Sequence, residues 1–195
     1  LKRLVSSLAI LSEPNCFLID ITPDFKYQLQ LIESKLNHKP CISGICITHA
    51  HFGHYMGLLE LGLEVMNTDA VPIYVMPKMK SFLENNAPFC QLIELNNINL
   101  ISMRENDRIK IDDNLFIIPF QVPHRNEFSE TVGYQIQSAK KSVLYIPDID
   151  SWDEWDSDIN ALIKENEFVL IDGTFYNKTE VKSRDISAIP HPSIL

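Results

Sequence analysis

The chain has 195 residues, of which 45% are hydrophobic and 22% are charged, and its formal net charge is -9. A chain of this length can bury a sizeable core, and its apolar residues come in runs far shorter than the roughly 20 residues needed to cross a bilayer. The acidic balance and the absence of a basic cluster argue against a nucleic-acid backbone as partner. The chain starts at Leu1 rather than Met, so we expect one domain over residues 1–195 that is part of a longer chain.

The first hundred residues alternate predicted strands with predicted helices. Short apolar runs predict strands, and apolar residues at helical spacing, such as Phe25, Leu29 and Ile32, predict a helix. Pro23 suits the start of that helix. In chain order we expect strand Leu4–Ile10, strand Cys16–Ile21, helix Asp24–Leu36, strand Gly44–Thr48, helix Tyr55–Met66, strand Pro72–Val75 and helix Met79–Asn85.

From Asn99 onward short strands follow one another, in a pattern typical of a meander. The turn-forming run Asp112-Asp113-Asn114 lies between two of them, as a hairpin requires. The expected strands are Leu100–Ser102, Arg108–Ile111, Leu115–Phe120, Val132–Gln137 and Ser142–Ile146, followed by a polar helix Trp152–Glu165 and strand Phe168–Ile171. Strands interleaved with a few helices predict a layered α/β architecture.

The four cysteines show no Cys-x-x-Cys spacing. Cys16 and Cys46 lie in apolar, strand-like runs, so buried free thiols are the simplest interpretation. Free thiols fit a reducing compartment, and we expect a cytoplasmic protein.

Three of the six histidines, His49, His51 and His54, fall within six residues. At the end of a strand, residues i and i+2 face the same side, so His49 and His51 can direct two imidazoles at one ion. His54 would reach the same place from the turn into the next helix. Imidazole is a common ligand of zinc and of iron, so the window favours a metal site over polar loop residues that cap a helix.

Three residues further along could belong to the same site: His124, Asp148 and His191. Each alone has a simpler interpretation, as a surface histidine, a turn-forming aspartate and a loop histidine. His124 and Asp148 follow predicted strands, however. Together with the three clustered histidines, this pattern favours one shared site. Arg125 and Glu127, beside His124, are either substrate contacts or, more simply, part of a solvated loop.

The segment from Thr48 to Leu58 resembles the His-x-His-x-Asp-His loop of the metallo-β-lactamase superfamily, and the order of the other candidate residues is similar. Three further segments resemble the branch that contains the pyrroloquinoline quinone (PQQ) biosynthesis protein B: Asp172-Gly173-Thr174-Phe175-Tyr176, Ser6-Ser7-Leu8-Ala9-Ile10 and Thr22-Pro23-Asp24. The resemblance implies an αββα sandwich with the metals at one edge of its two sheets.

The resemblance also implies a division of roles among the candidate residues. His49, His51 and His124 would hold a first metal, Asp148 would bridge two metals, and His54 and His191 would serve the second. Asp20 would orient the histidine loop through hydrogen bonds. Asp148 and His54 are the residues to which we assign a catalytic role. The expected cofactor is zinc, as one or two ions, with iron or manganese as alternatives.

One position departs from the superfamily pattern. Gly53 stands where the superfamily usually has an aspartate that binds the second metal, and glycine offers no side chain. One metal only, a weaker second metal, or a different ion with water in the vacancy would each be consistent with this change.

Three functions fit these residues. A metallo-hydrolase that acts on a small-molecule substrate through a metal-activated water is the commonest outcome on this fold. A non-haem iron oxidoreductase is the second, because histidines with a carboxylate also suit iron and the PQQ branch is linked to oxidation. The third is a non-catalytic metal-binding module, which only Gly53 favours. Neither the substrate nor the oligomeric state can be read from the sequence.

Overall fold

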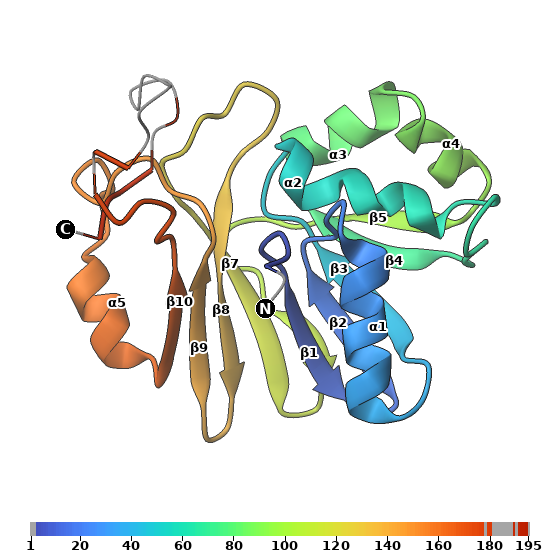
Figure 1. The fold of residues 1–195 in the computed structure, drawn as a ribbon, viewed down its shortest axis with the longest axis horizontal. Helices are drawn as coiled ribbons and strands as arrows, with labels where there is room; N and C mark the ends of the chain where they lie inside the picture. Colours follow the sequence, from blue (N-terminus) through green and yellow to red (C-terminus); the bar gives the residue numbers. More distant parts are fainter. Residues whose placement is uncertain (1–2, 178, 181–188, 190, 195) are drawn as a thin grey trace. The chain divides into compact units, whose positions relative to one another are not determined.

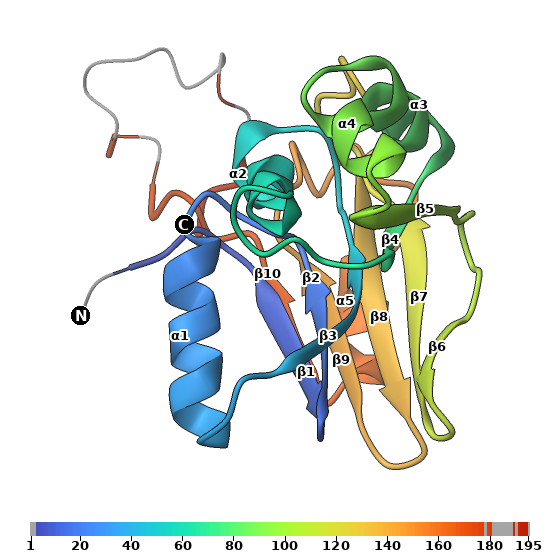
Figure 2. The ribbon, with the colours of Figure 1, turned by 90° about the vertical axis from the view of Figure 1, so that its right-hand side faces the viewer.

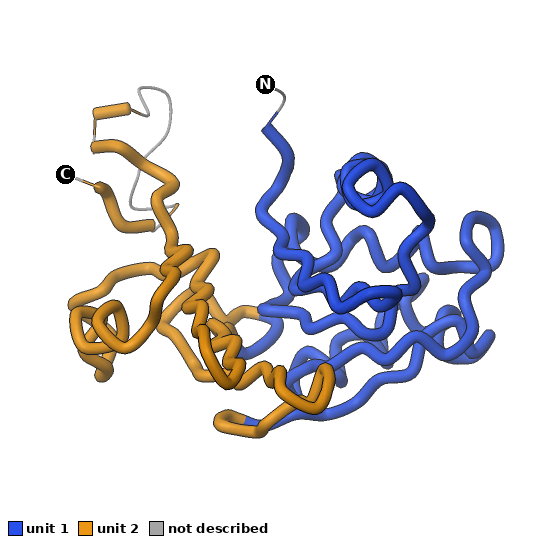
Figure 3. Tube along the Cα trace, turned by 90° about the horizontal axis from the view of Figure 1, so that it is seen from below, with its two compact units in different colours: residues 1–104, 128–130 blue, residues 105–127, 131–195 orange. Residues whose placement is uncertain are grey.

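The computed structural model describes residues 3–177, 179–180, 189 and 191–194. The chain divides into two compact units (Figure 3). Unit 1 comprises Leu1–Arg104 and Phe128–Glu130, and unit 2 comprises Glu105–Glu127 and Thr131–Leu195. Among the described residues, no helix is both long enough and apolar enough to cross a membrane.

Unit 1 contains a mixed five-stranded sheet in the order β1-β2-β3-β4-β5, in which only β1 is antiparallel to its neighbour (Figures 1 and 2). Its elements are β1 (Leu8–Ser12), β2 (Asn15–Ile19), α1 (Phe25–Leu36), β3 (Cys41–Cys46), α2 (Phe52–Tyr55), the 3-10 helix η1 (Met56–Leu61), β4 (Val71–Val75), α3 (Pro77–Asn85), α4 (Phe89–Glu94) and β5 (Ile98–Ser102). Because β2 to β5 run parallel, their carboxyl ends lie at one edge of the sheet.

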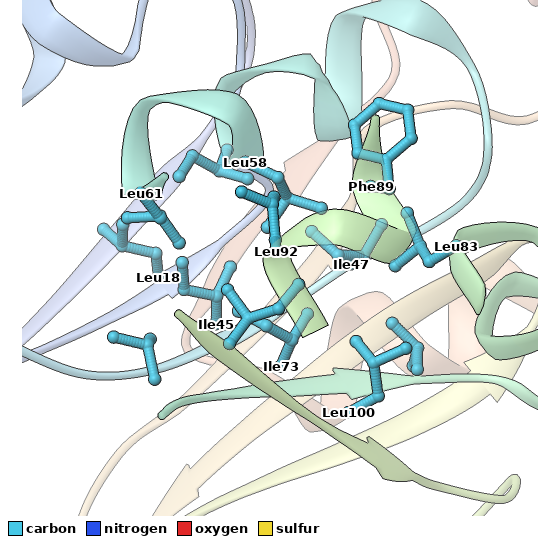
Figure 4. Close-up of a cluster of buried hydrophobic side chains, with 14 of the residues drawn as sticks. Leu18, Ile45, Ile47, Leu58, Leu61, Ile73, Leu83, Phe89, Leu92 and Leu100 are labelled. Carbon is cyan, nitrogen blue, oxygen red and sulfur yellow. The ribbon is translucent and has the colours of Figure 1, made fainter. Parts of the chain in front are cut away.

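The core of unit 1 lies between this sheet and the helices that follow its strands. Figure 4 shows Ile45 and Ile73 from neighbouring strands beside Leu58 and Leu61 of η1 and Leu92 of α4. All five side chains are buried. Full burial of one such aliphatic side chain contributes about 1.5–3 kcal/mol, so this packing holds the segment after β3 firmly against the sheet.

Unit 2 contains a second mixed sheet, in the order β10-β9-β8-β7-β6, with only the β10–β9 pair parallel. Its elements are β6 (Ile109–Asp112), β7 (Leu115–Gln121), β8 (Val132–Ser138), β9 (Ser142–Ile146), α5 (Ile159–Glu165) and β10 (Phe168–Ile171). Both β7 and β9 run antiparallel to β8. The carboxyl ends of β7, β9 and β10 therefore lie at one edge of this sheet.

Most predicted elements are present, with shifted ends, and four expectations are wrong. The strand expected at Leu4–Ile10 begins only at Leu8, and the helix expected at Tyr55–Met66 is instead the short α2 followed by η1. The helix expected at Trp152–Glu165 begins at Ile159, where the Asp158 side chain caps it by accepting a hydrogen bond from the backbone N–H of Asn160 at 2.8 Å. The meander does not begin near Asn99, because β5 pairs with β4 in the sheet of unit 1.

Other expectations are confirmed. The Asp112-Asp113-Asn114 turn joins β6 to β7, with the Asp112 carboxylate accepting from the backbone N–H of Asn114 at 2.8 Å. Cys16 and Cys46 are buried free thiols, and burial raises the pKa of the Cys16 thiol to about 11, with Cys41 contributing further. A thiol with this pKa stays protonated at neutral pH.

Candidate metal centre

In unit 1 the site is built on Asp20, the residue that follows β2. Its backbone has φ 62°, a left-handed conformation that aspartate tolerates better than most residues. The buried carboxylate accepts hydrogen bonds from the backbone N–H of Thr48 at 2.8 Å and from the Thr48 hydroxyl at 3.0 Å. It also lies 2.7 Å from Nδ1 of His54. Burial raises the pKa of the Asp20 carboxyl, an effect that His54 and Thr48 oppose.

His49 and His51 follow β3 with two nitrogen atoms close together. Nε2 of His49 lies 2.8 Å from Nδ1 of His51, and the two rings are nearly perpendicular, at 79°. Nδ1 of His49 lies 3.0 Å from the Thr48 hydroxyl. The two imidazoles thus converge through one nitrogen each, as the alternation of side chains at a strand end predicts.

His54 lies in α2, which two backbone contacts hold against the segment after β2. The backbone N–H of Ile21 donates to the His54 carbonyl at 2.9 Å, and that of Gly57 donates to the Ile21 carbonyl at 2.9 Å. The His54 ring is buried, with its centroid 4.2 Å from that of His49. Its Nδ1 bond to Asp20 makes Nε2 the ring nitrogen that can bind a metal or accept a proton.

Ser129 is a further support of the histidine loop. This buried residue belongs to unit 1 although it follows β7 in the chain, and its hydroxyl accepts from the backbone N–H of Ala50 at 2.8 Å. The bond fixes the residue between His49 and His51. Sequence reasoning missed Ser129, because no local pattern marks a contact across 79 residues.

In unit 2, His124 follows β7 and contacts two aspartates that follow β9. Its Nδ1 lies 2.6 Å from an oxygen of Asp150, and its Nε2 lies 3.9 Å from an oxygen of Asp148. The His124 side chain is fully buried, and that of Asp148 is 16% exposed. Asp150 therefore orients the imidazole, while Asp148 lies on the side of its other nitrogen.

His191 is held beside the end of β10. Its Nδ1 lies 2.5 Å from an oxygen of Asp172, whose carboxylate also accepts from Thr174 and from the backbone of Ile149. The ring centroid lies 5.5 Å from that of His124. Burial lowers the pKa of His191, but the hydrogen bond and charge of Asp172 outweigh it, and the net pKa is raised.

Unit 2 therefore contains a His/Asp group able to hold a metal ion. Ligand atoms of Asp148, Asp172 and His191 all lie within 4.8 Å of one another. The Asp172 oxygens already accept four hydrogen bonds or contacts, one of them with His191, so Asp148 and His191 are the better candidate ligands. Sequence reasoning assigned no role at the site to Asp150 or Asp172, although both lie close after strands.

Comparison with known proteins gives the family. Residues 15–193 match the family model described as "Beta-lactamase superfamily domain". The chain belongs to the metallo-β-lactamase superfamily. The α/β fold class expected from the sequence, with the two mixed sheets of the metallo-β-lactamase fold, is thereby confirmed. No curated protein matches the chain.

Solved structures with the same superfamily fold cover nearly the whole chain. Zn²⁺-bound PqqB from Methylobacterium extorquens is 22% identical, with a TM-score of 0.75 over 98% of this chain and 66% of that one. A diphosphatase of the PhnP family is 20% identical, with a TM-score of 0.64 over 98% and 64%. The short form of human tRNase Z is 15% identical, with a TM-score of 0.61 over 97% and 76%. The chain thus spans just under two thirds of the length of the first two. These likenesses show the fold, and the likeness to PqqB agrees with the sequence resemblance.

Proposed function

We propose that the chain forms the metal-binding part of a hydrolase that acts on a small-molecule substrate through a metal-activated water. The observation that carries this proposal is the set of side-chain contacts that orient the candidate ligand histidines. Four of them have one ring nitrogen against a side-chain oxygen within the same unit: His49 with Thr48, His54 with Asp20, His124 with Asp150 and His191 with Asp172. Metal-binding histidines almost always have such a partner on the nitrogen that does not bind the metal.

The residues fit a zinc-type ion. Two nitrogens bound to one tetrahedral zinc at about 2.0–2.1 Å would lie about 3.3 Å apart. Nε2 of His49 and Nδ1 of His51 are 2.8 Å apart, so a shift of about half an ångström would let both bind one ion. Imidazoles with a carboxylate suit zinc and also non-haem iron.

We propose that one ion is shared between the two units. His49 and His51 of unit 1 would bind it with His124 and Asp148 of unit 2, and the family match over residues 15–193 supports this, because it includes both units. His54, His191 and Asp148 would form a second, weaker position, since Gly53 supplies no carboxylate. Asp20 would orient the histidine loop from its buried position.

The chemistry follows from these roles. A bound zinc ion lowers the pKa of its water to about 7 and so supplies hydroxide near neutral pH. Asp148, beside that ion, would orient the water by accepting a hydrogen bond from it. Asp20 keeps a proton on Nδ1 of His54, so that Nε2 of His54 can exchange a proton with the substrate.

The test is the metal content of protein purified without added metal, measured by elemental mass spectrometry. We expect about one zinc per chain, and loss of that ion in both His51→Ala and His124→Ala. The double variant should lose no more than either single variant, because both residues would serve the same ion. His38→Ala is the matched control, since His38 is exposed and its ring contacts only the Lys39 carbonyl among the described residues.

The outcomes separate the alternatives. Full metal content in both single variants would contradict the proposed ligands. Iron in place of zinc, with consumption of oxygen, would favour the oxidoreductase that the sequence also allows. Bound zinc without hydrolysis of phosphate esters, thioesters or lactones in a broad screen would favour a non-catalytic module.

A further inference from the structure

The residue after His124 is Arg125, whose side chain has one buried nitrogen without a hydrogen-bond partner among the described residues. Arg125 is half-buried, and its Nε is one of three buried side-chain atoms without a hydrogen-bond partner among the described residues, with Asn97 Oδ1 and Thr131 Oγ1. Of these three, only Arg125 carries a charge. Asp148 and Asp150 contact His124 instead, at 3.9 and 2.6 Å.

A buried guanidinium nitrogen without a hydrogen-bond partner is costly, because burial removes water from a donor of a group that remains charged at every accessible pH. Such groups in folded proteins are normally paired or hydrogen-bonded. Acidic residues outnumber basic ones by 26 to 17 in this chain, so a shortage of carboxylates does not explain why Nε of Arg125 has no partner. This arrangement fits a partner that belongs to a bound ligand.

Arg125 lies within electrostatic reach of the proposed metal ligands of unit 2. It directly follows His124 in the chain and is near enough to His191 for the two charges to interact, and the His191 ring is 5.5 Å from that of His124. A guanidinium next to a bound cation would be repelled by it. An anion near both of them removes that repulsion and satisfies both charges.

We propose that Arg125 binds an anionic group of the substrate, a carboxylate or a phosphate. The planar guanidinium matches the geometry of both groups, which it can contact through two parallel hydrogen bonds. This inference rests on the proposed function in one respect, namely that the bound anion belongs to the molecule that the metal centre hydrolyses. It narrows the substrate class to anionic molecules.

The experiment is calorimetric titration with inorganic phosphate and, separately, with malonate. Wild type, Arg125→Gln and Arg125→Lys are each compared in zinc-loaded form and after removal of metal with EDTA. We expect Arg125→Gln to bind the preferred anion about 10- to 100-fold more weakly, the loss typical of a charge-assisted hydrogen bond. Arg125→Lys should lie between, since it keeps the charge without the two-pronged geometry. A preference for phosphate or for malonate identifies the group.

Arg108→Gln is the control, because Arg108 is also in unit 2 but is exposed, with its guanidinium 4.4 Å from the centroid of the Phe116 ring. Equal anion binding by wild type and Arg125→Gln in both forms, or no binding by wild type, would overturn the inference. If wild type holds no metal but still binds anions through Arg125, the proposed function fails and the anion site stands. If Arg125→Gln unfolds, Arg125→Lys with unchanged anion affinity also overturns it.

Discussion

A carboxylate beside an imidazole has two effects at the residue scale. It keeps the proton on the near nitrogen, so that the far nitrogen carries the lone pair, and it makes that lone pair more basic. Asp20, Asp150 and Asp172 each contact Nδ1 of a histidine, so Nε2 is the available ligand atom in His54, His124 and His191. The protein thus fixes which ring nitrogen is available to a metal ion.

Gly53 gives a residue-scale prediction about the number of metal ions. Its backbone does not require glycine, since no glycine of the described chain has positive φ, and an added Cβ would meet only Val5, at 3.4 Å. The substitution Gly53→Asp is therefore sterically possible and restores the carboxylate usual in the superfamily. We expect the zinc content to rise from about one towards two ions per chain, with stability in the metal-free state changed by less than about 0.5 kcal/mol.

The control for this substitution is Gly53→Asn, which fills similar space without a charge and should leave the metal content unchanged. Metal content is read by elemental mass spectrometry and stability by chemical denaturation. A Gly53→Asp variant that still holds one ion would mean that the missing carboxylate is not what limits the second position.

At the scale of elements, local sequence patterns mark the candidate residues but not the residues with which they form hydrogen bonds. His49, His51, His124 and Asp148 all follow strands, and a polar residue after an apolar run is a local signal. The partners of these residues are not local: Thr48 and Asp20 are 28 residues apart. Which acidic residue meets which histidine depends on sheet order, and one sequence does not encode that order in any local pattern.

One helix and one strand pairing were missed for similar reasons. Helix α4 begins after Pro88 and carries buried Phe89 and Leu92, but its six residues are too few for helical periodicity to be evident. The strand expected at Leu100–Ser102 is present as part of β5, but its parallel pairing with β4 was not predicted, because that pairing depends on the intervening helices. Sequence patterns therefore give the type of an element more readily than its neighbour.

Gly57 gives a prediction at this scale. An added Cβ would lie 2.4 Å from the Thr22 carbonyl oxygen and 2.9 Å from that of Ile21, and backbone cannot yield as a flexible side chain can. Gly57→Ala should push η1 and α2 away from the end of β2, at a cost of about 1–3 kcal/mol in the free energy of unfolding. The same shift should separate His54 from Asp20 and weaken metal binding.

Gly53→Ala is the control for Gly57→Ala, four residues away in the same pair of short helices. Its Cβ has room, so we expect unchanged or slightly higher stability. Denaturant unfolding and zinc titration of both variants provide the measurements. If the two alanine variants were equally stable, the close approach of η1 to the Ile21–Thr22 backbone would not be a constraint on this fold.

At the scale of the whole molecule, the two units carry different natural probes. All four cysteines, Cys16, Cys41, Cys46 and Cys90, lie in unit 1, and both tryptophans, Trp152 and Trp155, lie in unit 2. Tryptophan fluorescence therefore follows unit 2. Alkylation of buried Cys16 and Cys46 follows unit 1, because the Cys16 thiol, with its pKa of about 11, reacts only slowly until unfolding exposes it.

These probes test whether one ion joins the units. A ligand whose free concentration is 100 times its dissociation constant stabilises the state that binds it by about 2.7 kcal/mol. If that state needs residues of both units, both units are stabilised together.

In zinc-loaded protein, with Cys41 and Cys90 replaced by serine, we expect fluorescence and alkylation to report one denaturation midpoint. After treatment with EDTA both midpoints should fall and separate. His51→Ala in the presence of zinc should behave like the EDTA-treated protein, and His38→Ala like wild type. A zinc effect confined to one probe would mean that the ion is held by that unit alone, and the shared set of His49, His51, His124 and Asp148 would have to be abandoned.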